Sequence, residues 1–164
     1  MAFMATLWKP NVTVAAVVYQ NDRFLLVEEN TRDGIRYNNP AGHLDPGESL
    51  VQAVIRETRE ETAYRFTPTG WLGAYMTRTC ISGTREDITY LRVAFLGQVS
   101  DHGPAQALDT GIVRALWLSL DEVRALQHLH RSPLVMKCIE DCLAGQRLPL
   151  EALYTHDSIW LRQS

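Results

Sequence analysis

The sequence predicts an α+β protein built from a largely hairpin-connected sheet and several helices. β-branched and apolar runs fill most of the first 30 residues and recur up to residue 118, whereas capped helical patterns occur in the middle and near the C-terminus. Strands and helices do not alternate as repeated βαβ units. A length of 164 residues fits one domain, so we expect residues 1–164 to form a single domain.

The first strands are predicted at 12–19 and 23–29, where VTVAAVVY and RFLLVEE flank the turn signal QND. We expect these two runs to form a hairpin. The next segment, IRYNNPAGHL, can supply only short extended pieces, because Pro40 restricts the residue before it and Gly42 interrupts the run. Further strands are expected around 66–79, 88–99 and 112–118.

A helix is predicted from about residue 49 to residue 63. DPGE places Pro46 and Gly47 at the positions that a type II turn prefers. Ser49 is a good N-cap, and Gln52 three residues later completes a capping-box pattern. The apolar residues that follow provide one packing face, so the turn and the helix form one local unit.

The C-terminal part is predicted to be helical. SLDEVRALQHL begins at Ser119, which is a suitable cap. SPLVMKCIEDCLAG combines Ser132 as a cap, Pro133 in the first turn and Gly145 as a terminator. We therefore expect two further helices after the last strand.

Composition and charge exclude several classes of protein. No stretch reaches the apolar length of a membrane span, and MAFMATLWKP lacks the pattern of a secretory signal, so we expect a cytoplasmic protein without a membrane role. A formal net charge of -3 gives no basic footprint for a nucleic-acid polymer. Cys80, Cys138 and Cys142 lack CxxC spacing, which indicates free thiols.

Three carboxylates, Glu57, Glu60 and Glu61, crowd onto one side of the predicted helix. Like charges three and four residues apart repel each other, so a compensating group is expected. Oxygen ligands suit Mg²⁺ or Mn²⁺ far better than zinc. Gly42 has no Cβ, so its backbone can approach a metal or a phosphate closely and its carbonyl can serve as a further ligand.

Such a site suits diphosphate chemistry, because divalent ions bridge phosphate oxygens and activate a water whose proton a spare glutamate can take. Arg56 carries a fork that can hold a carboxylate in two parallel hydrogen bonds, and Glu48 is its candidate partner. A helix that is merely charged on its exposed side is the plainer explanation of the same pattern.

The spacing of these residues resembles the signature of the Nudix hydrolases. The family's box has G, E, R, E, E and E at the positions held here by Gly42, Glu48, Arg56, Glu57, Glu60 and Glu61. Ala63 stands where the family usually has Gly, and Thr58 and Tyr64 stand where it prefers aliphatic residues. We expect Ala63 to alter the geometry after the helix without loss of chemistry.

The resemblance implies the Nudix fold, a mixed β-sheet sandwiched between α-helices, and Mg²⁺-dependent hydrolysis of a nucleoside diphosphate linked to another group. By the family pattern, the three helix glutamates carry over as metal ligands or general base, and Gly42 as a carbonyl ligand of the metal. Glu48 and Arg56 carry over as organisers of the site. Which glutamate acts as the base varies across the family.

Beyond the box, KPNVTVAAVV, NNPAGHLDPGESL, WLSLDEV, RSPLV and GQRLPLE resemble the bacterial NudJ-type phosphatases. That resemblance implies removal of the terminal phosphate from nucleoside tri- and diphosphates, hydroxymethylpyrimidine diphosphate and thiamine diphosphate. Two alternatives stay open: a Nudix pyrophosphatase acting on sugar-linked, dinucleotide-linked or deeper triphosphate bonds, and a module that binds a nucleotide without hydrolysing it. We expect a small-molecule phosphate substrate and a monomer or homodimer.

Substrate contacts have weaker signals. Tyr37 could stack on a flat ring, although packing within a strand explains it equally well, and nearby Asn39 is a second candidate for substrate binding. Arginines that could meet phosphates are Arg32, Arg36, Arg78, Arg85 and Arg92. Most surface arginines only solvate a face, so the sequence gives no basis for choosing among them.

Overall fold

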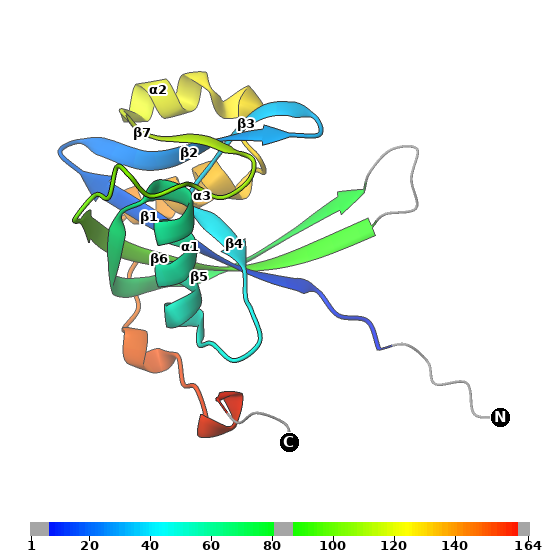
Figure 1. Cartoon of the computed structure of the whole chain (residues 1–164). Coiled ribbons are helices and arrows are strands. Elements are labelled where there is room, and N and C mark those ends of the chain that lie inside the picture. Colours follow the sequence, from blue (N-terminus) through cyan, green and yellow to red (C-terminus); the bar gives the residue numbers. More distant parts are fainter. Residues whose placement is uncertain (1–6, 81–86, 161–164) are drawn as a thin grey trace.

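The computed structural model describes residues 7–80 and 87–160. Within this part, seven strands form one sheet, and helices lie on both of its faces (Figure 1). The elements in chain order are β1 (Asn11–Gln20), β2 (Arg23–Thr31), β3 (Gly34–Asn38), β4 (Ala41–His43), α1 (Leu50–Thr62), β5 (Arg65–Cys80), β6 (Asp87–Ser100), β7 (Ile112–Leu118), α2 (Leu120–Ala125), η1 (Gln127–Leu129), α3 (Leu134–Leu143), η2 (Leu150–Ala152) and η3 (Asp157–Ile159). The strands expected at 66–79, 88–99 and 112–118 are confirmed as β5, β6 and β7.

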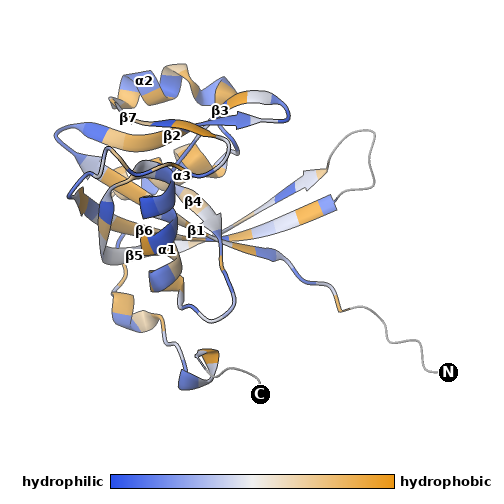
Figure 2. Cartoon of the chain, viewed as in Figure 1, coloured by the Kyte–Doolittle hydropathy of each residue, from blue (hydrophilic) through white to orange (hydrophobic). Residues whose placement is uncertain are grey.

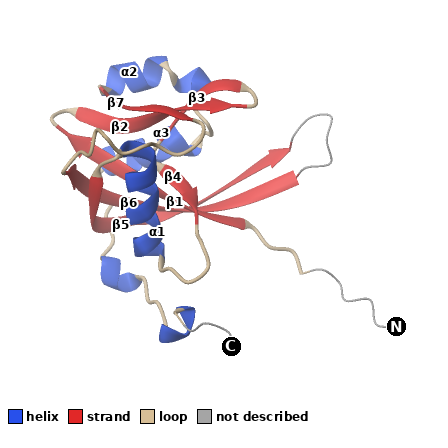
Figure 3. Ribbon diagram, viewed as in Figure 1, coloured by secondary structure: helices blue, strands red, loops and turns tan. Residues whose placement is uncertain are grey.

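The expected hairpin between β1 and β2 forms, but its strands soon separate. The antiparallel register pairs Tyr19 with Phe24 and Gln20 with Arg23. Beyond these pairs, β1 lies between the parallel β6 and the antiparallel β4, and β2 lies between β3 and β7. The parallel pairing makes the sheet mixed, as the Nudix resemblance implied (Figure 3).

Side chains of β1 alternate between two hydrophobic clusters. Val14 and Val18 pack with Val54 of α1, whereas Ala15 and Val17 belong to the cluster that includes residues of α2 and α3. This alternation follows from the two-residue period of a strand. α1 therefore covers one face of the sheet and α3 the other, and the prediction of a sheet sandwiched between helices is confirmed (Figures 1 and 2).

The turn and cap before α1 form as predicted. Gly47 has a φ of +86°, as the third position of a type II turn requires. Ser49 is the N-cap, its hydroxyl accepting from the Gln52 N–H at 3.1 Å while its own N–H donates to the Gln52 side chain at 2.9 Å. Ala63, at the C-cap, has a φ of 59°, so the alanine itself takes the left-handed conformation usually left to glycine. The expected change of geometry after the helix is thus absent at this residue.

The C-terminal helices differ slightly from the prediction. α2 ends at Ala125 and a short 3₁₀ turn follows, rather than one helix through SLDEVRALQHL. Pro133 is the N-cap of α3, so Ser132 lies one residue before the cap position expected for it. The Ser132 hydroxyl accepts a hydrogen bond from the Leu134 N–H at 3.2 Å. Within the described residues, no helix is both long enough and apolar enough to cross a membrane.

Candidate active site

The acidic face of α1 packs against β4 and is more buried than an ordinary charged helix surface. Glu57 and Glu61 are 8% and 7% exposed, whereas Glu60 keeps intermediate exposure. Thr58 between them is buried too, and its hydroxyl donates to the Val54 carbonyl at 2.7 Å, so a threonine is tolerated where the family prefers an aliphatic residue. Glutamates are rarely buried without a partner, which argues against a merely solvated face.

Gly42 of β4 lies directly against the Glu57 carboxylate. A Cβ built on Gly42 would fall inside 3.0 Å of the carboxylate atoms, which real Cβ atoms essentially never do. Pairing of Gly42 with Val14 of β1 holds this part of β4 in place. A side chain at Gly42 would therefore displace Glu57. The use of the Gly42 carbonyl as a metal ligand stays a prediction.

Arg56 connects the turn before α1 to the carboxylates on it. Its Nε and Nη2 donate to the two oxygens of Glu48 at 3.0 and 2.7 Å, which confirms the expected two-bond pair. Its Nη1 donates to Glu57 at 2.8 Å and to Glu60 at 2.9 Å, and Nη2 also donates to the His43 carbonyl. The bonds to Glu48 raise the pKa of Arg56 and lower the pKa of Glu48. Arg56 thereby orients two of the three helix glutamates.

A fourth carboxylate, Asp109, joins this face from the loop before β7. One oxygen each from Glu57, Glu60 and Asp109 lie within 4.8 Å of one another. The Asp109 N–H donates to the Glu60 carbonyl at 3.0 Å, which ties the loop to the end of α1. Nothing in the sequence pointed to Asp109, because an acidic residue in a polar loop far along the chain carries no signal of its own.

Glu61 falls outside that group of three carboxylates, but it lines a cavity together with Asp109. Its Oε2 accepts from the Ala41 N–H at 2.8 Å. Burial raises the pKa of Glu61 to about 9, against the opposing effect of this hydrogen bond. Burial also raises the pKa of Glu57, although Arg56 acts in the other direction. In both residues burial favours the neutral acid, so a cation nearby would favour the ionised carboxylate.

The donor set fits a hard divalent cation. The Glu57, Glu60 and Asp109 oxygens that come within 4.8 Å of one another belong to carboxylates, without His or Cys in the group. Mg²⁺ and Mn²⁺ prefer such oxygen ligands. A cation here would also relieve the repulsion among the carboxylates. The cluster is thus a candidate site for a divalent metal.

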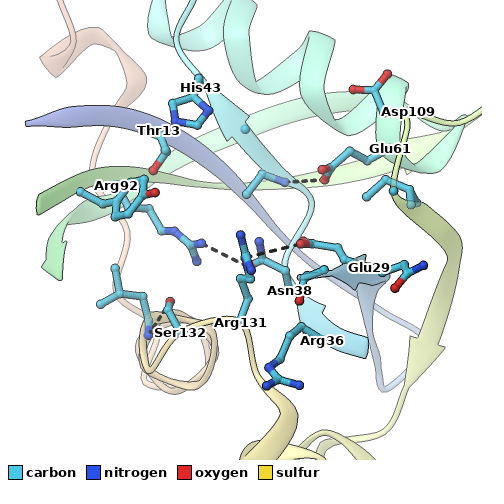
Figure 4. Close-up of a pocket in the computed structure, with 18 of the residues that line it drawn as sticks. Thr13, Glu29, Arg36, Asn38, His43, Glu61, Arg92, Asp109, Arg131 and Ser132 are labelled. Carbon is cyan, nitrogen blue, oxygen red and sulfur yellow. Dashed lines mark hydrogen bonds and ion pairs between the residues drawn. The ribbon is translucent and has the colours of Figure 1, made fainter. Parts of the chain in front are cut away.

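A polar cavity of about 710 Å³ opens beside the acidic helix (Figure 4). It extends from Glu61 past Thr13 and His43 to Arg92 and Arg131. Its volume is in the range of small-molecule sites. The cavity thus places carboxylates and arginines around one space.

The structure separates the arginines that the sequence could not rank. Three of them line the cavity: Arg32, Arg36 and Arg92. Arg78 forms an exposed ion pair with Asp87, and Arg85 lies outside the described residues. Arg131 is a further cavity arginine that had no sequence signal; its N–H donates to the Tyr37 carbonyl at 2.8 Å, which ties the segment before α3 to β3.

Tyr37 and Asn39 lie outside the set of residues that line the cavity. Tyr37 packs against the hydrophobic cluster on the α3 side, and its hydroxyl donates to Glu28 at 3.3 Å. Asn39 is 1% exposed, and its Oδ1 accepts from Arg92 at 3.4 Å. These positions support the cavity wall, and direct contact of either residue with substrate stays a prediction.

Comparison with known proteins finds similar sequences and structures among the Nudix hydrolases. The family model described as NUDIX domain matches residues 9–138. Phosphatase NudJ of Escherichia coli strain K12 is 35% identical over 147 residues, covering 90% of this chain and 92% of that protein. A NUDIX hydrolase structure from Nitrosomonas europaea is 55% identical, with a TM-score of 0.85, and the match covers 91% of this chain and 99% of that one. An Ap4A hydrolase structure from C. elegans, 21% identical with a TM-score of 0.59 over 82% of this chain and 98% of that one, shares the fold.

Proposed function

Because the chain belongs to the Nudix hydrolase family, we propose that it is a Mg²⁺-dependent phosphatase that removes the terminal phosphate of small diphosphates and nucleoside tri- and diphosphates. Hydroxymethylpyrimidine diphosphate and thiamine diphosphate belong to the proposed substrates. The products are orthophosphate and the substrate shortened by one phosphoryl group. The relatives named Phosphatase NudJ support this choice within the family.

The observation that carries the proposal is the meeting of a carboxylate cluster with a cavity that arginines line. Carboxylate oxygens from α1 and from the loop before β7 converge beside this cavity. Arginine forks suit phosphate oxygens, and hard cations bridge carboxylates to phosphates. One space therefore offers complementary groups for a small anionic substrate and for its metal ion.

In the proposed reaction, the charged residues of α1 divide into metal ligands, a general base and a positioning residue. Glu57 and Glu60 would hold Mg²⁺ together with Asp109, and Mn²⁺ could substitute. The ion would neutralise phosphate charge and lower the pKa of a water molecule. With a divalent cation nearby to favour its ionised form, Glu61 would accept the proton of the attacking water, whose oxygen bonds to the terminal phosphorus as the bridging P–O bond breaks. Arg56 holds the two metal-binding glutamates in position.

The nature of the products tests the bond that is broken. The protein is incubated with Mg²⁺ and GTP, GDP, thiamine diphosphate, hydroxymethylpyrimidine diphosphate, ADP-ribose or a dinucleoside polyphosphate, and orthophosphate and pyrophosphate are quantified separately. Orthophosphate from the diphosphates is expected. Pyrophosphate or split dinucleotides would move the activity to a Nudix pyrophosphatase, and metal-independent binding without turnover would reveal a binding module.

The role of Glu61 is tested by Glu61→Gln. Glutamine keeps an oxygen acceptor for the Ala41 N–H but loses the carboxylate base. General bases contribute about 10²- to 10⁴-fold, so turnover should fall by at least about a hundredfold while thermal unfolding stays near that of the wild type. Near-normal turnover would count heavily against this assignment.

The remaining sequence-based expectations belong to the same proposal. They are a single domain over residues 1–164, a cytoplasmic location, and a monomer or homodimer acting on small molecules rather than on nucleic-acid polymers. Cell fractionation and light scattering of the purified protein test the location and the oligomeric state.

A further inference from the structure

A buried arginine, Arg92 on β6, forms part of the cavity wall. Arg92 is 6% exposed, yet it lines the cavity. Its Nη2 donates to Asn38 Oδ1 at 3.1 Å, and its Nη1 donates to Asn39 Oδ1 at 3.4 Å. The Cys138 side chain of α3 is a further partner of this guanidinium. A guanidinium group has five N–H donors, so these three neighbours leave donors for a ligand.

The charge of Arg92 has no carboxylate partner in an ion pair within residues 7–80 and 87–160. Two carboxylates of the same cavity act on the charge of Arg92 only from a distance, because their close contacts are with other groups. Glu29 lies 3.7 Å from the Arg131 guanidinium, and Glu61 accepts the Ala41 N–H. A buried cation without a close carboxylate partner is unfavourable, and burial lowers the pKa of Arg92 against the opposing effects of Cys138, Glu29 and Glu61. An anion in the cavity would offset this cost.

The sheet register places Arg92 beside the carboxylate cluster rather than within it. Thr13 of β1 pairs with Arg92 on one side and with His43 on the other, so these three residues form a row along the cavity (Figure 4). Neighbouring strands are about 4.8 Å apart, which puts the backbones of Arg92 and His43 roughly 10 Å from each other. Gly42, which touches Glu57, precedes His43 in the chain. Asp109 of the cluster and Arg92 line the same cavity, so a diphosphate bound there could meet the two with different phosphoryl groups.

We propose that Arg92 binds the phosphoryl group that stays on the product after the terminal phosphate leaves. This inference rests on the proposed function, in which the carboxylate cluster serves the phosphoryl group under attack. The guanidinium fork holds the retained group through charge-assisted hydrogen bonds to its oxygens. Asn38 and Asn39 act through Arg92, because their amides fix its plane without adding negative charge that would compete with the ligand.

Binding of product-like monophosphates in the absence of metal tests this role. Dissociation constants of GMP, AMP and CMP are measured by calorimetry in EDTA for the full-length wild type, Arg92→Met, Arg92→Lys and Arg78→Met. Arg78→Met is the matched control, because Arg78 lies on the adjacent strand β5 but does not line the cavity. We expect Arg92→Met to weaken binding about 10- to 100-fold for all three bases alike, and Arg92→Lys to recover part of the affinity. Arg78→Met should bind like the wild type.

A second variant, Asn39→Asp, leaves Arg92 in place, so the inference can still be tested if Arg92→Met fails to fold. The new carboxylate supplies the ion-pair partner that Arg92 lacks, so the protein should unfold at a higher temperature while its Kd for GMP rises about tenfold. If Arg92 had a merely structural role, Asn39→Asp would stabilise the protein and leave the Kd unchanged.

Three results would overturn the inference: a Kd unaffected by Arg92→Met, a loss confined to one base, or no binding of monophosphates to the wild type at millimolar concentration. Release of orthophosphate is measured in parallel on the same preparations. Normal turnover together with a Kd that Arg92→Met leaves unchanged would contradict this inference and leave the proposed function in place. Absent turnover with an Arg92-dependent Kd would defeat the proposed function and keep the anion site.

Discussion

Gly42→Ala is expected to lower turnover by about a hundredfold in a protein that remains folded. The added Cβ would fall inside 3.0 Å of the Glu57 carboxylate, whereas ordinary contact begins at 3.4 Å, so the carboxylate must retreat by on the order of 1 Å. A misplacement of about 1 Å in a catalytic arrangement can cost about 10²-fold. Gly42 is absent from the residues with positive φ, so alanine adds no backbone strain.

The assay is steady-state release of orthophosphate with Mg²⁺, accompanied by thermal unfolding of each variant. Gly103→Ala is the matched control, because its Cβ would meet the Ala63 carbonyl oxygen at an ordinary 3.8 Å. The control should keep wild-type turnover, and both variants should unfold near the wild-type temperature. Turnover of Gly42→Ala within about threefold of the control would refute the idea that the site depends on this close approach.

Three further changes test other contacts. Asp109→Asn should weaken Mn²⁺ binding, measured by calorimetry, by at least about tenfold without unfolding the protein; unchanged affinity would remove Asp109 from the metal site. Glu48→Gln should lower the free energy of unfolding by about 2 kcal/mol at pH 7. The bond from Arg56 lowers the folded-state pKa of Glu48 below 4.5. The difference in unfolding free energy between the wild type and Glu48→Gln should therefore persist above pH 4.5 and vanish as the pH falls through the folded-state pKa. A difference in urea unfolding that does not change with pH would contradict the ion pair. Tyr75→Phe removes a 2.8 Å hydrogen bond to Asp141 and should lower the free energy of unfolding by about 1 kcal/mol, which an unchanged urea midpoint would disprove.

Much of the acidic helix was predictable because its signals are local. The capping box of Ser49 and Gln52 acts within one turn, and Arg56 reaches back along the first turns of the same helix to Glu48, which directly precedes the N-cap. The spacing of the carboxylates likewise depends only on the helical period. Ala63 shows the limit of such local inference, because its left-handed conformation replaced the expected change of geometry.

The positions of the strands were predictable from the sequence, but their pairing in the sheet was not. Runs of β-branched residues marked β1, β2 and β7, yet the local pattern did not reveal that β1 leaves its hairpin partner to pair with β6 in parallel. That pairing joins residues 79 positions apart in the chain, such as Asn11 and Tyr90, and such register depends on packing of the whole core.

The sequence by itself determined the carboxylate-bearing helix, its caps, its link to Glu48 and its resemblance to a hydrolase family. The tertiary structure decided which distant groups meet that helix: Asp109 from a loop, and Arg92 and Arg131 across the cavity. The physical reason is the sequence separation over which each interaction acts. Capping and helical periodicity act between residues a few positions apart, whereas the burial of Arg92 and the approach of Asp109 arise only when the strands have paired and the layers have packed.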